Sequence, residues 1–204
     1  MEDTSGSPTV STKLQRIAEQ AKQYPTTVFT TLGHLINVEL LTAAYHCTRS
    51  DAAAGIDGVT AQQYGEALAA NLQSLNERLK SGQYRAPAIK RVYIEKEDGS
   101  KRPIGISAFE DKVVQRAVVM VMGAIYEQDF YDFSYGFRPG RSPHQALKQL
   151  RQQCMGMNIN WIVDADISAF FDSLDRSQLR EMIKQRINDG QIIRLIGKWL
   201  NAGV

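Results

Sequence analysis

Residues 161–172 read WIVDADISAFFD, and this stretch decides the fold class of the chain. Its apolar start predicts a β-strand over 161–167, on which Asp164 and Asp166 share one face because strand side chains alternate between faces. Burying a carboxylate there is costly unless a cation or hydrogen-bond donors compensate, and Mg²⁺ prefers such hard oxygen ligands. From the spacing alone two interpretations stay open: the pair binds a metal ion, or one aspartate caps the next turn while the other meets solvent.

Helices surround this strand on both sides in the sequence. Periodicity predicts a helix that ends near Pro25, helices over 32–47, 60–81, 110–127 and 190–201, one opening at Ser142 and Pro143, and one capped by Asp175. Before the first of them, residues 1–11 are rich in Ser, Thr, Gly and Pro, which predicts a disordered tail. Helices, a hairpin, more helices, a strand and final helices together indicate an α+β fold.

A β-hairpin is predicted over residues 89–106, because two alternating runs flank the turn signal Asp98 and Gly99. Its cations are Lys90, Arg91, Lys96, Lys101 and Arg102. Lys96 and Arg102 flank the turn on opposite strands, where a lysine and the fork of an arginine can hold a triphosphate. The same pattern also suits a solvated edge hairpin whose lysines discourage aggregation.

A third feature is the loop at residues 134–142, which reads SYGFRPGRS. Arg138 and Arg141 are interleaved there with Tyr135 and Phe137, and two glycines allow a close approach of the backbone. Such a loop suits a nucleic-acid backbone through phosphate contacts and stacking. A rigid structural loop with buried aromatic side chains is the alternative interpretation.

Composition sets limits on these interpretations. Of 204 residues 43% are hydrophobic, which is enough for a packed core, and the net charge is only +2 because 24 Lys+Arg face 22 Asp+Glu. Overall charge therefore does not indicate a nucleic-acid binder; local clustering has to do so. Cys47 and Cys154 have no metal-ligand spacing, and no apolar run is long enough for a membrane span. A cytoplasmic protein with reduced thiols and no membrane partner is expected.

Taken in order, the motifs resemble the reverse transcriptase/maturase proteins encoded by group II introns, over about residues 32–204. The matching pieces are GIDGV (55–59), RVYIEKEDG (91–99), RPIGI (102–106), EDKVVQ (110–115), SYGFRPGRS (134–142) and DADISAFFD (164–172). The resemblance implies reverse transcriptase fingers and a partial palm. It divides the chain into a flexible N-terminus and first helix (1–31), an N-terminal extension of the fingers (32–84), fingers (85–158) and the first part of the palm (159–204).

The resemblance also implies roles for residues at matching positions. Asp166 is expected to be the first catalytic carboxylate and to bind Mg²⁺, with Mn²⁺ as the alternative ion and the carbonyl of Ile167 as an added ligand. The expected nucleotide-binding residues are Lys96, Arg102, Phe171 and, as the alternative to Phe171 under the sugar, Phe170. The expected nucleic-acid-binding residues are Lys90, Arg91, Arg138 and Arg141, the last two either holding the backbone or supporting the fingers. The implied partners are template RNA, intron RNA, a DNA primer and dNTP.

One departure from the family limits the expected activity. The Tyr-x-Asp-Asp hairpin that completes the family's metal site does not occur in these 204 residues. The chain is therefore expected to be truncated before that hairpin, to be inactive alone, and to need the missing C-terminal half, which can be a separate chain. The alternatives are an intron-RNA-binding remnant without catalysis, a fragment of a bacterial defence-type reverse transcriptase, and a decayed gene product that does not fold.

Overall fold

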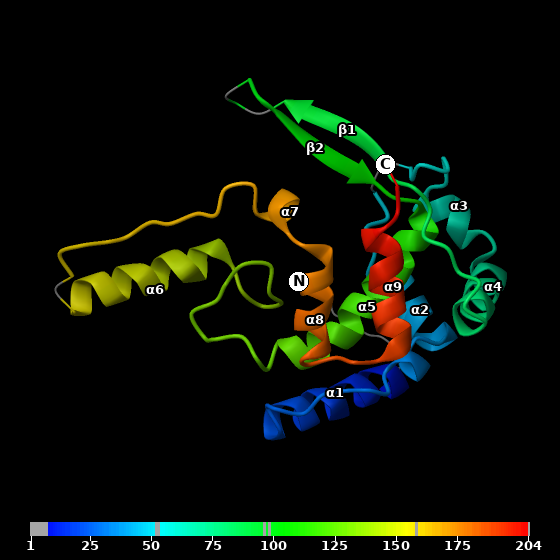
Figure 1. The fold of residues 1–204 in the computed structure, drawn as a ribbon, viewed down its shortest axis with the longest axis horizontal. Helices are drawn as coiled ribbons and strands as arrows, with labels where there is room; N and C mark the ends of the chain where they lie inside the picture. Colours follow the sequence, from blue (N-terminus) through cyan, green and yellow to red (C-terminus); the bar gives the residue numbers. More distant parts are fainter. Residues whose placement is uncertain (1–7, 52–53, 96, 98, 158, 204) are drawn as a thin grey trace.

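The computed structural model describes residues 8–51, 54–95, 97, 99–157 and 159–203. The helices are α1 (Pro8–Gln23), α2 (Val38–His46), α3 (Ala61–Gly65), α4 (Leu68–Lys80), α5 (Phe109–Tyr126), α6 (Pro143–Gly156), α7 (Phe170–Ser173), α8 (Arg176–Lys184) and α9 (Gly190–Leu200), with a 3-10 turn η1 (Gly33–Leu35). Two strands, β1 (Lys90–Glu95) and β2 (Lys101–Ile106), form an antiparallel hairpin. The predicted α+β class is confirmed, with helices dominating (Figure 1).

Helix α5 is the centre of the helical body. It contacts α1, α2 and α3, and its inward face carries Val113, Val114, Ala117, Val118, Val121 and Ile125, all of them buried. These side chains recur at helical spacing, so one face of α5 can bury all of them. Each buried valine or isoleucine contributes about 1.5–3 kcal/mol relative to exposure. This body therefore provides the rigid support from which the hairpin and α6 project (Figure 1).

Side-chain caps set where several helices begin. The predicted caps Thr60, Ser142 and Asp175 are confirmed: each accepts hydrogen bonds from the first turn of its helix. Two predicted helices were too long. The helix expected over 32–47 begins only at Val38, and the one expected over 60–81 is broken between α3 and α4, where Ala67 leaves helical geometry.

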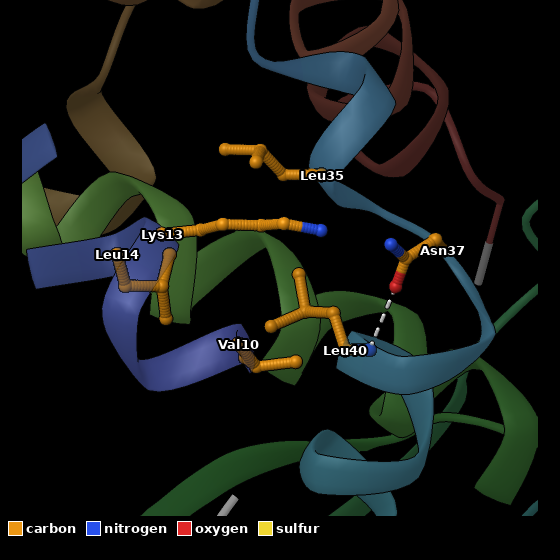
Figure 2. A pocket seen from close by; sticks show the side chains of 6 residues that line it. All are labelled: Val10, Lys13, Leu14, Leu35, Asn37 and Leu40. Atoms are coloured by element: carbon orange, nitrogen blue, oxygen red, sulfur yellow. Dashed lines mark hydrogen bonds between the residues drawn. The ribbon is translucent and has the colours of Figure 1, made fainter. Parts of the chain in front are cut away.

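Asn37 explains the first of these shortened helices. Its Oδ1 accepts from the Leu40 N–H at 3.0 Å and so caps α2, while η1 precedes it as a separate turn (Figure 2). Helix α1 covers this junction and begins at Pro8, so the predicted disorder of residues 8–11 is wrong; residues 1–7 of that prediction lie outside the described residues. Val10 of α1 is buried against Leu40, and the cavity left there is about 10 Å³. That volume is at the lower limit for one water molecule, so this junction is a packing contact and not a ligand site.

The predicted hairpin is present, with β1 and β2 as its two strands. Ile94 lies opposite Arg102, Tyr93 opposite Pro103, and Gly99 has the positive φ of 77° that the tight turn needs. Pro103 is tolerated because both strands are edges of a two-stranded sheet. At the root, the Ile89 N–H donates to the Gly203 carbonyl at 2.9 Å, which fastens the hairpin to the segment after α9.

The predicted strand over residues 161–167 is not present. The segment is extended, but within the described residues it pairs with no other strand, since the sheet contains β1 and β2 alone. Alternation of side chains can indicate a strand, but a strand forms only where a neighbouring backbone completes the ladder. Helix α6 is equally unsupported, because none of its residues is buried. Figure 1 shows both projecting away from the helical body.

Candidate nucleic-acid interface

Residues 161–167, hereafter the aspartate segment, are an exposed run of mostly apolar residues. Val163 is 90% exposed, Trp161 and Ile167 are also exposed, and so are the residues Asp164 and Asp166 between them. Ala169 then adopts the left-handed region at φ 50°, which redirects the chain into the short helix α7. The structure therefore shows both carboxylates accessible at the entrance to a sharp turn, where they can reach a ligand.

Two aromatic residues follow this turn. The rings of Phe170 and Phe171 meet edge to face, with centroids 5.4 Å apart and planes at 63°. Phe171 is 85% exposed, whereas Phe170 is about half as exposed. The more accessible ring is thus the one that the resemblance assigns to the sugar of the nucleotide.

The donors near Asp166 suit a hard cation but are few. A carboxylate and the carbonyl of Ile167 are oxygen ligands of the kind that Mg²⁺ accepts. Among the described residues, however, there is no group of three or more His, Cys, Asp or Glu side chains that could hold a metal ion. The chemistry of the donors fits one ligand position of a metal centre, and a complete two-ion centre needs further carboxylates from outside the described residues.

The pairing register divides the hairpin cations between two faces. Residues directly opposite each other in an antiparallel pair point to the same side, so Arg102 shares its face with Ile94 and with Lys90. Arg91 points to the other face, where Tyr93 also lies. Lys90 and Arg102 are about 13 Å apart along the strands, four residues at the usual rise. They are therefore separate positive charges on one face of the hairpin. Lys96, predicted to flank the turn on the strand opposite Arg102, lies outside the described residues.

Arg138 is held inside its own loop. Its side chain is 7% exposed, and its guanidinium donates to Glu127 Oε2 at 3.1 Å and to the carbonyls of Tyr131 and Ser134 at 2.9 Å each. It also lies over the ring of Phe130, 4.9 Å from the centroid. Of the two predicted roles for Arg138, these contacts favour support of the loop over contact with a nucleic-acid backbone.

Arg141 is more accessible and borders a groove. It donates to the Asp132 carbonyl at 3.0 Å and lies 5.3 Å from the centroid of the Tyr135 ring. The groove has a volume of about 430 Å³ and is lined by Asp132, Tyr135, Arg141, Gln145, Lys148, Gln149 and Gln152. Three glutamines, a lysine and an arginine offer many donors to phosphate and sugar oxygens. This surface between the 128–142 loop and α6 is hereafter the amide groove.

Aromatic side chains stand out from the same loop. Phe137 is fully exposed and has a φ of 57°, a conformation that a residue with a Cβ rarely adopts. Tyr131 and Phe133 are also exposed, and their rings are stacked at 5.0 Å with planes 8° apart. The predicted alternative of buried aromatic residues is wrong for Phe137, although Tyr135 is half-buried. Accessible rings beside cations are what unpaired bases stack on.

Comparison with known proteins decides the family. Residues 94–202 match the family described as reverse transcriptase (RNA-dependent DNA polymerase). The chain belongs to the reverse transcriptase family. The match includes the hairpin turn and β2, the 128–142 loop and the aspartate segment, whereas Lys90 and Arg91 of β1 precede it.

Curated relatives confirm the group II intron branch of reverse transcriptases. Protein YkfC of Escherichia coli (strain K12) is 40% identical over 152 residues, 73% of this chain and 40% of that protein. The group II intron-encoded protein LtrA of Lactococcus lactis subsp. cremoris is 35% identical over 195 residues, 93% of this chain and 32% of that protein. Nuclear intron maturase 1, mitochondrial, of Arabidopsis thaliana is 30% identical over 97 residues, 48% of this chain and 13% of that protein. The chain spans less than half of the length of each of these relatives.

Two further findings concern membrane spans and metal use. No helix in the described part of the chain is long and apolar enough to cross a membrane. Reverse transcriptases generally use divalent metal ions, which agrees with the exposed carboxylates of the aspartate segment.

The sequence reasoning missed the buried polar contacts that position these surfaces. Asp111 of α5 accepts from Tyr84, from Trp199 Nε1 at 2.8 Å and from Gln115 Nε2 at 2.7 Å. Burial, followed by the hydrogen bond to Asp111, raises the pKa of Tyr84, so its hydroxyl stays a donor. The network joins α5 and α9 to the segment that leads into the hairpin. No local pattern indicates it, because its members are far apart in sequence.

Asp189 is a second missed residue, for which a signal existed. Its Oδ1 caps α9 by accepting from Gln191 and Ile192, and its Oδ2 accepts from Leu32 at 2.7 Å and Gly33 at 2.9 Å. Burial alone would raise the pKa of Asp189, but these four N–H donors outweigh it and hold the pKa below its ordinary value. An aspartate before an apolar periodic run predicts the cap, whereas the contact with η1 depends on the tertiary fold.

Proposed function

We propose that this chain is the N-terminal part of an RNA-directed DNA polymerase of the group II intron type. Residues 32–84 form the N-terminal extension, 85–158 the fingers and 159–204 the first part of the palm. The chain contributes template and nucleotide binding together with the first catalytic aspartate, Asp166. The observation that carries this proposal is the position of Asp166 in an exposed apolar segment that pairs with no described strand.

The exposed segment argues for completion by further polypeptide. Soluble monomers rarely leave a contiguous apolar run such as Trp161 to Ile167 in contact with water. Its free backbone groups and alternating side chains are suited to adding neighbouring strands. We therefore assign the missing neighbours to the remaining palm, which also supplies the further carboxylates that a two-ion centre requires. It reaches this chain either in the same polypeptide or as a separate one.

The nucleotide site is built around Asp166. Its carboxylate and the carbonyl of Ile167 would hold Mg²⁺, or Mn²⁺ in its place. When bound, the ions activate the primer 3′-hydroxyl and stabilise the leaving pyrophosphate. Phe171, more exposed than Phe170, lies under the sugar of the dNTP and excludes a 2′-hydroxyl, while Arg102, with Lys96, binds the triphosphate.

Template RNA and the DNA primer bind through exposed cations and rings. Arg141 and the amide groove hold the backbone, and Phe137 stacks on an unpaired base. Arg91 adds a phosphate contact on one face of the hairpin and Lys90 on the other. Arg138 keeps the loop in shape for this contact and does not itself bind the backbone.

The test is primer extension on an RNA template. The chain is combined with the polypeptide encoded directly downstream in the same DNA, either joined or co-expressed, and extension is measured with Mg²⁺. Asp166→Asn should abolish extension, and Asp164→Asn, a matched change two residues away, should retain most of it. Extension by the Asp166→Asn enzyme, or a downstream sequence without further palm carboxylates, would overturn the polymerase assignment.

RNA binding without catalysis is the second candidate function. It is favoured by one contrast: the amide groove is formed entirely by described residues, whereas the metal centre is incomplete among them. In that case the chain recognises RNA, of which intron RNA is the expected form in this family, and Asp166 has no role. An Asp166→Asn variant that binds RNA normally, in a chain that shows no extension with any downstream partner, would support this second function.

A further inference from the structure

A second groove lies on the other side of the helical body. Its volume is about 260 Å³, and it separates the C-terminal turn of α4 from one face of α9. Lys80 comes from α4, while Gln191, Arg194 and Lys198 come from α9. The lining contains these three cations and no carboxylate. In a chain with 22 Asp+Glu against 24 Lys+Arg, such a lining is a local concentration of positive charge. It is hereafter the α4–α9 groove.

Lys198 is fixed in place at the edge of this groove. Its ammonium donates to the carbonyls of Gly82, at 3.1 Å, and Tyr84, and it lies 5.7 Å from the centroid of the Tyr84 ring. An ammonium has three N–H donors, so one remains for a ligand. Because the carbonyls belong to the turn after α4, Lys198 holds the two walls of the groove together and also presents a positioned positive charge.

The other donors of the groove lack acceptors. Arg194 and Lys80 are exposed and make no hydrogen bond or ion pair with any residue that the structure describes. The Gln191 Nε2 is buried, and among the described residues it likewise has no acceptor. That atom has no surface open to the groove, so the case for a ligand rests on the two cations. The free side chains of Arg194 and Lys80 point to an anionic ligand.

The size and place of the groove identify the kind of anion. The volume of about 260 Å³ is many times the roughly 10–15 Å³ that one water molecule needs, so the groove has room for more than one phosphate group. The groove includes Tyr84, which precedes the root of the hairpin, and the hairpin root is itself fastened to Gly203 after α9. A strand that leaves the hairpin therefore has a short path to the groove.

We infer that the α4–α9 groove binds the phosphodiester backbone of RNA, as a contact separate from the hairpin and the amide groove. Arg194 supplies a forked contact to one phosphate, and Lys80 and Lys198 neutralise its neighbours. The inference rests on the RNA binding proposed above and extends it to a surface beyond the 128–142 loop. Its effect is a longer footprint of RNA along the helical body.

The first experiment measures RNA affinity by fluorescence anisotropy with the full chain and a labelled single-stranded oligouridylate. Arg194→Glu should raise Kd about tenfold at 100 mM KCl and make the salt dependence shallower by about one phosphate contact. Arg16→Glu is the matched control, because it makes the same charge change at an exposed residue of α1 and should alter Kd less than twofold. Equal losses for the two variants would overturn the inference, since they would reflect net charge alone.

The second measurement needs no variant. Saturating RNA should slow acetylation of Lys80 several-fold and leave Lys22, an exposed lysine of α1, unchanged. Equal acetylation of Lys80 with and without RNA would overturn the inference. A competition with 10 mM inorganic phosphate at constant ionic strength tests the alternative of a small-anion site. If phosphate displaces RNA from the wild type but not from Arg194→Glu, the groove binds small anions and the inference is overturned.

The same assay separates this inference from the proposed function. If the wild-type chain binds no RNA, both fail. If Arg141→Ala weakens binding and Arg194→Glu does not, RNA binding at the amide groove stands and the α4–α9 groove alone is rejected. If both variants weaken binding and Arg16→Glu does not, the two surfaces belong to one RNA path.

Discussion

Arg186 and Asp129 form a two-armed ion pair, with Nε 2.8 Å from Oδ2 and the second guanidinium nitrogen 2.9 Å from Oδ1. The remaining guanidinium N–H groups donate to the carbonyls of Ala21, Tyr24 and Thr27, so that all five donors have acceptors. One side chain thus joins the segment after α8 to the ends of α5 and α1. In the sequence the aspartate segment precedes α8 and α9 follows it. The contacts of Arg186 therefore attach this part of the chain to the helical body.

Replacing Arg186 should destabilise the whole body. Its side chain is 8% exposed, so Arg186→Ala leaves Asp129 and the carbonyls of Ala21 and Thr27 without the donors they have here, and it should lower the free energy of unfolding by about 3–5 kcal/mol. Arg186→Lys should recover only part of that loss, because an ammonium cannot reproduce the fork. Urea unfolding followed by circular dichroism measures the difference.

The Arg49–Asp51 pair offers the control for this measurement. Both side chains are exposed, at 81% and 72%, and water screens their attraction. Arg49→Ala should therefore leave the urea midpoint nearly unchanged. A similar loss from Arg49→Ala and Arg186→Ala would mean that the buried contacts of Arg186 do not stabilise the fold.

Asp189 should make the stability of the chain depend on acid pH. Its pKa is lower in the folded state than in the unfolded state, so its stabilisation is complete above the ordinary aspartate pKa of about 3.9 and disappears as the pH falls through the lower, folded value. Asp189→Asn replaces one of the two accepting carboxylate oxygens by an NH₂ group, which cannot accept from the backbone N–H groups that face it. The variant should therefore have a lower Tm at pH 7. The Tm gap between the two proteins should narrow in acid, and a gap that stays constant down to pH 2.5 would contradict this account.

Local chemistry in the sequence was enough for the parts of the fold that local contacts determine. Thr60, Ser142 and Asp175 cap helices as predicted, and Gly99 provides the turn of the hairpin. Each of these contacts joins residues within four positions of one another. Prediction failed where a distant partner decides the outcome. The run at 161–167 has the pattern of a strand, yet no described strand pairs with it.

The candidate site shows the same division. Phe171 and Asp166 are exposed, and the roles that the family resemblance implies for them stay predictions. Nothing local distinguishes the two arginines of the 128–142 loop. Arg138 is enclosed because Glu127, eleven positions earlier, turns back toward it. Arg141 lies at a groove because α6 passes beside it. These two environments follow from the path of the chain, so no local pattern in the sequence could distinguish the two arginines.

Arg138 and Arg141 should therefore behave differently on substitution. Arg138→Ala removes a nearly buried guanidinium and should lower Tm, with RNA affinity falling only as the loop loses its shape. Arg141→Ala should leave Tm within about 2 °C and weaken RNA binding by about 1 kcal/mol, with a shallower salt dependence. Thermal melts and anisotropy titrations on both variants decide this. Unchanged RNA affinity in Arg141→Ala would make that arginine structural as well.

Phe137 tests whether strain in the loop serves binding. Phe137 lowers the stability of the fold in two ways: its φ of 57° is a strained backbone conformation, and its fully exposed ring buries no apolar surface. Asparagine tolerates the left-handed region, so Phe137→Asn should raise the free energy of unfolding by about 1 kcal/mol. The same change removes the ring and should weaken binding of single-stranded RNA by about 1–3 kcal/mol if one base stacks there.

Phe137→Ala separates these two effects, because it removes the ring and keeps a Cβ at the strained position. It should weaken RNA binding as much as Phe137→Asn does, without the gain in stability. Duplex RNA, which has no unpaired base to offer, should bind all three proteins alike. If Phe137→Asn is more stable and binds single-stranded RNA as well as the wild type, the exposed ring has no part in RNA recognition.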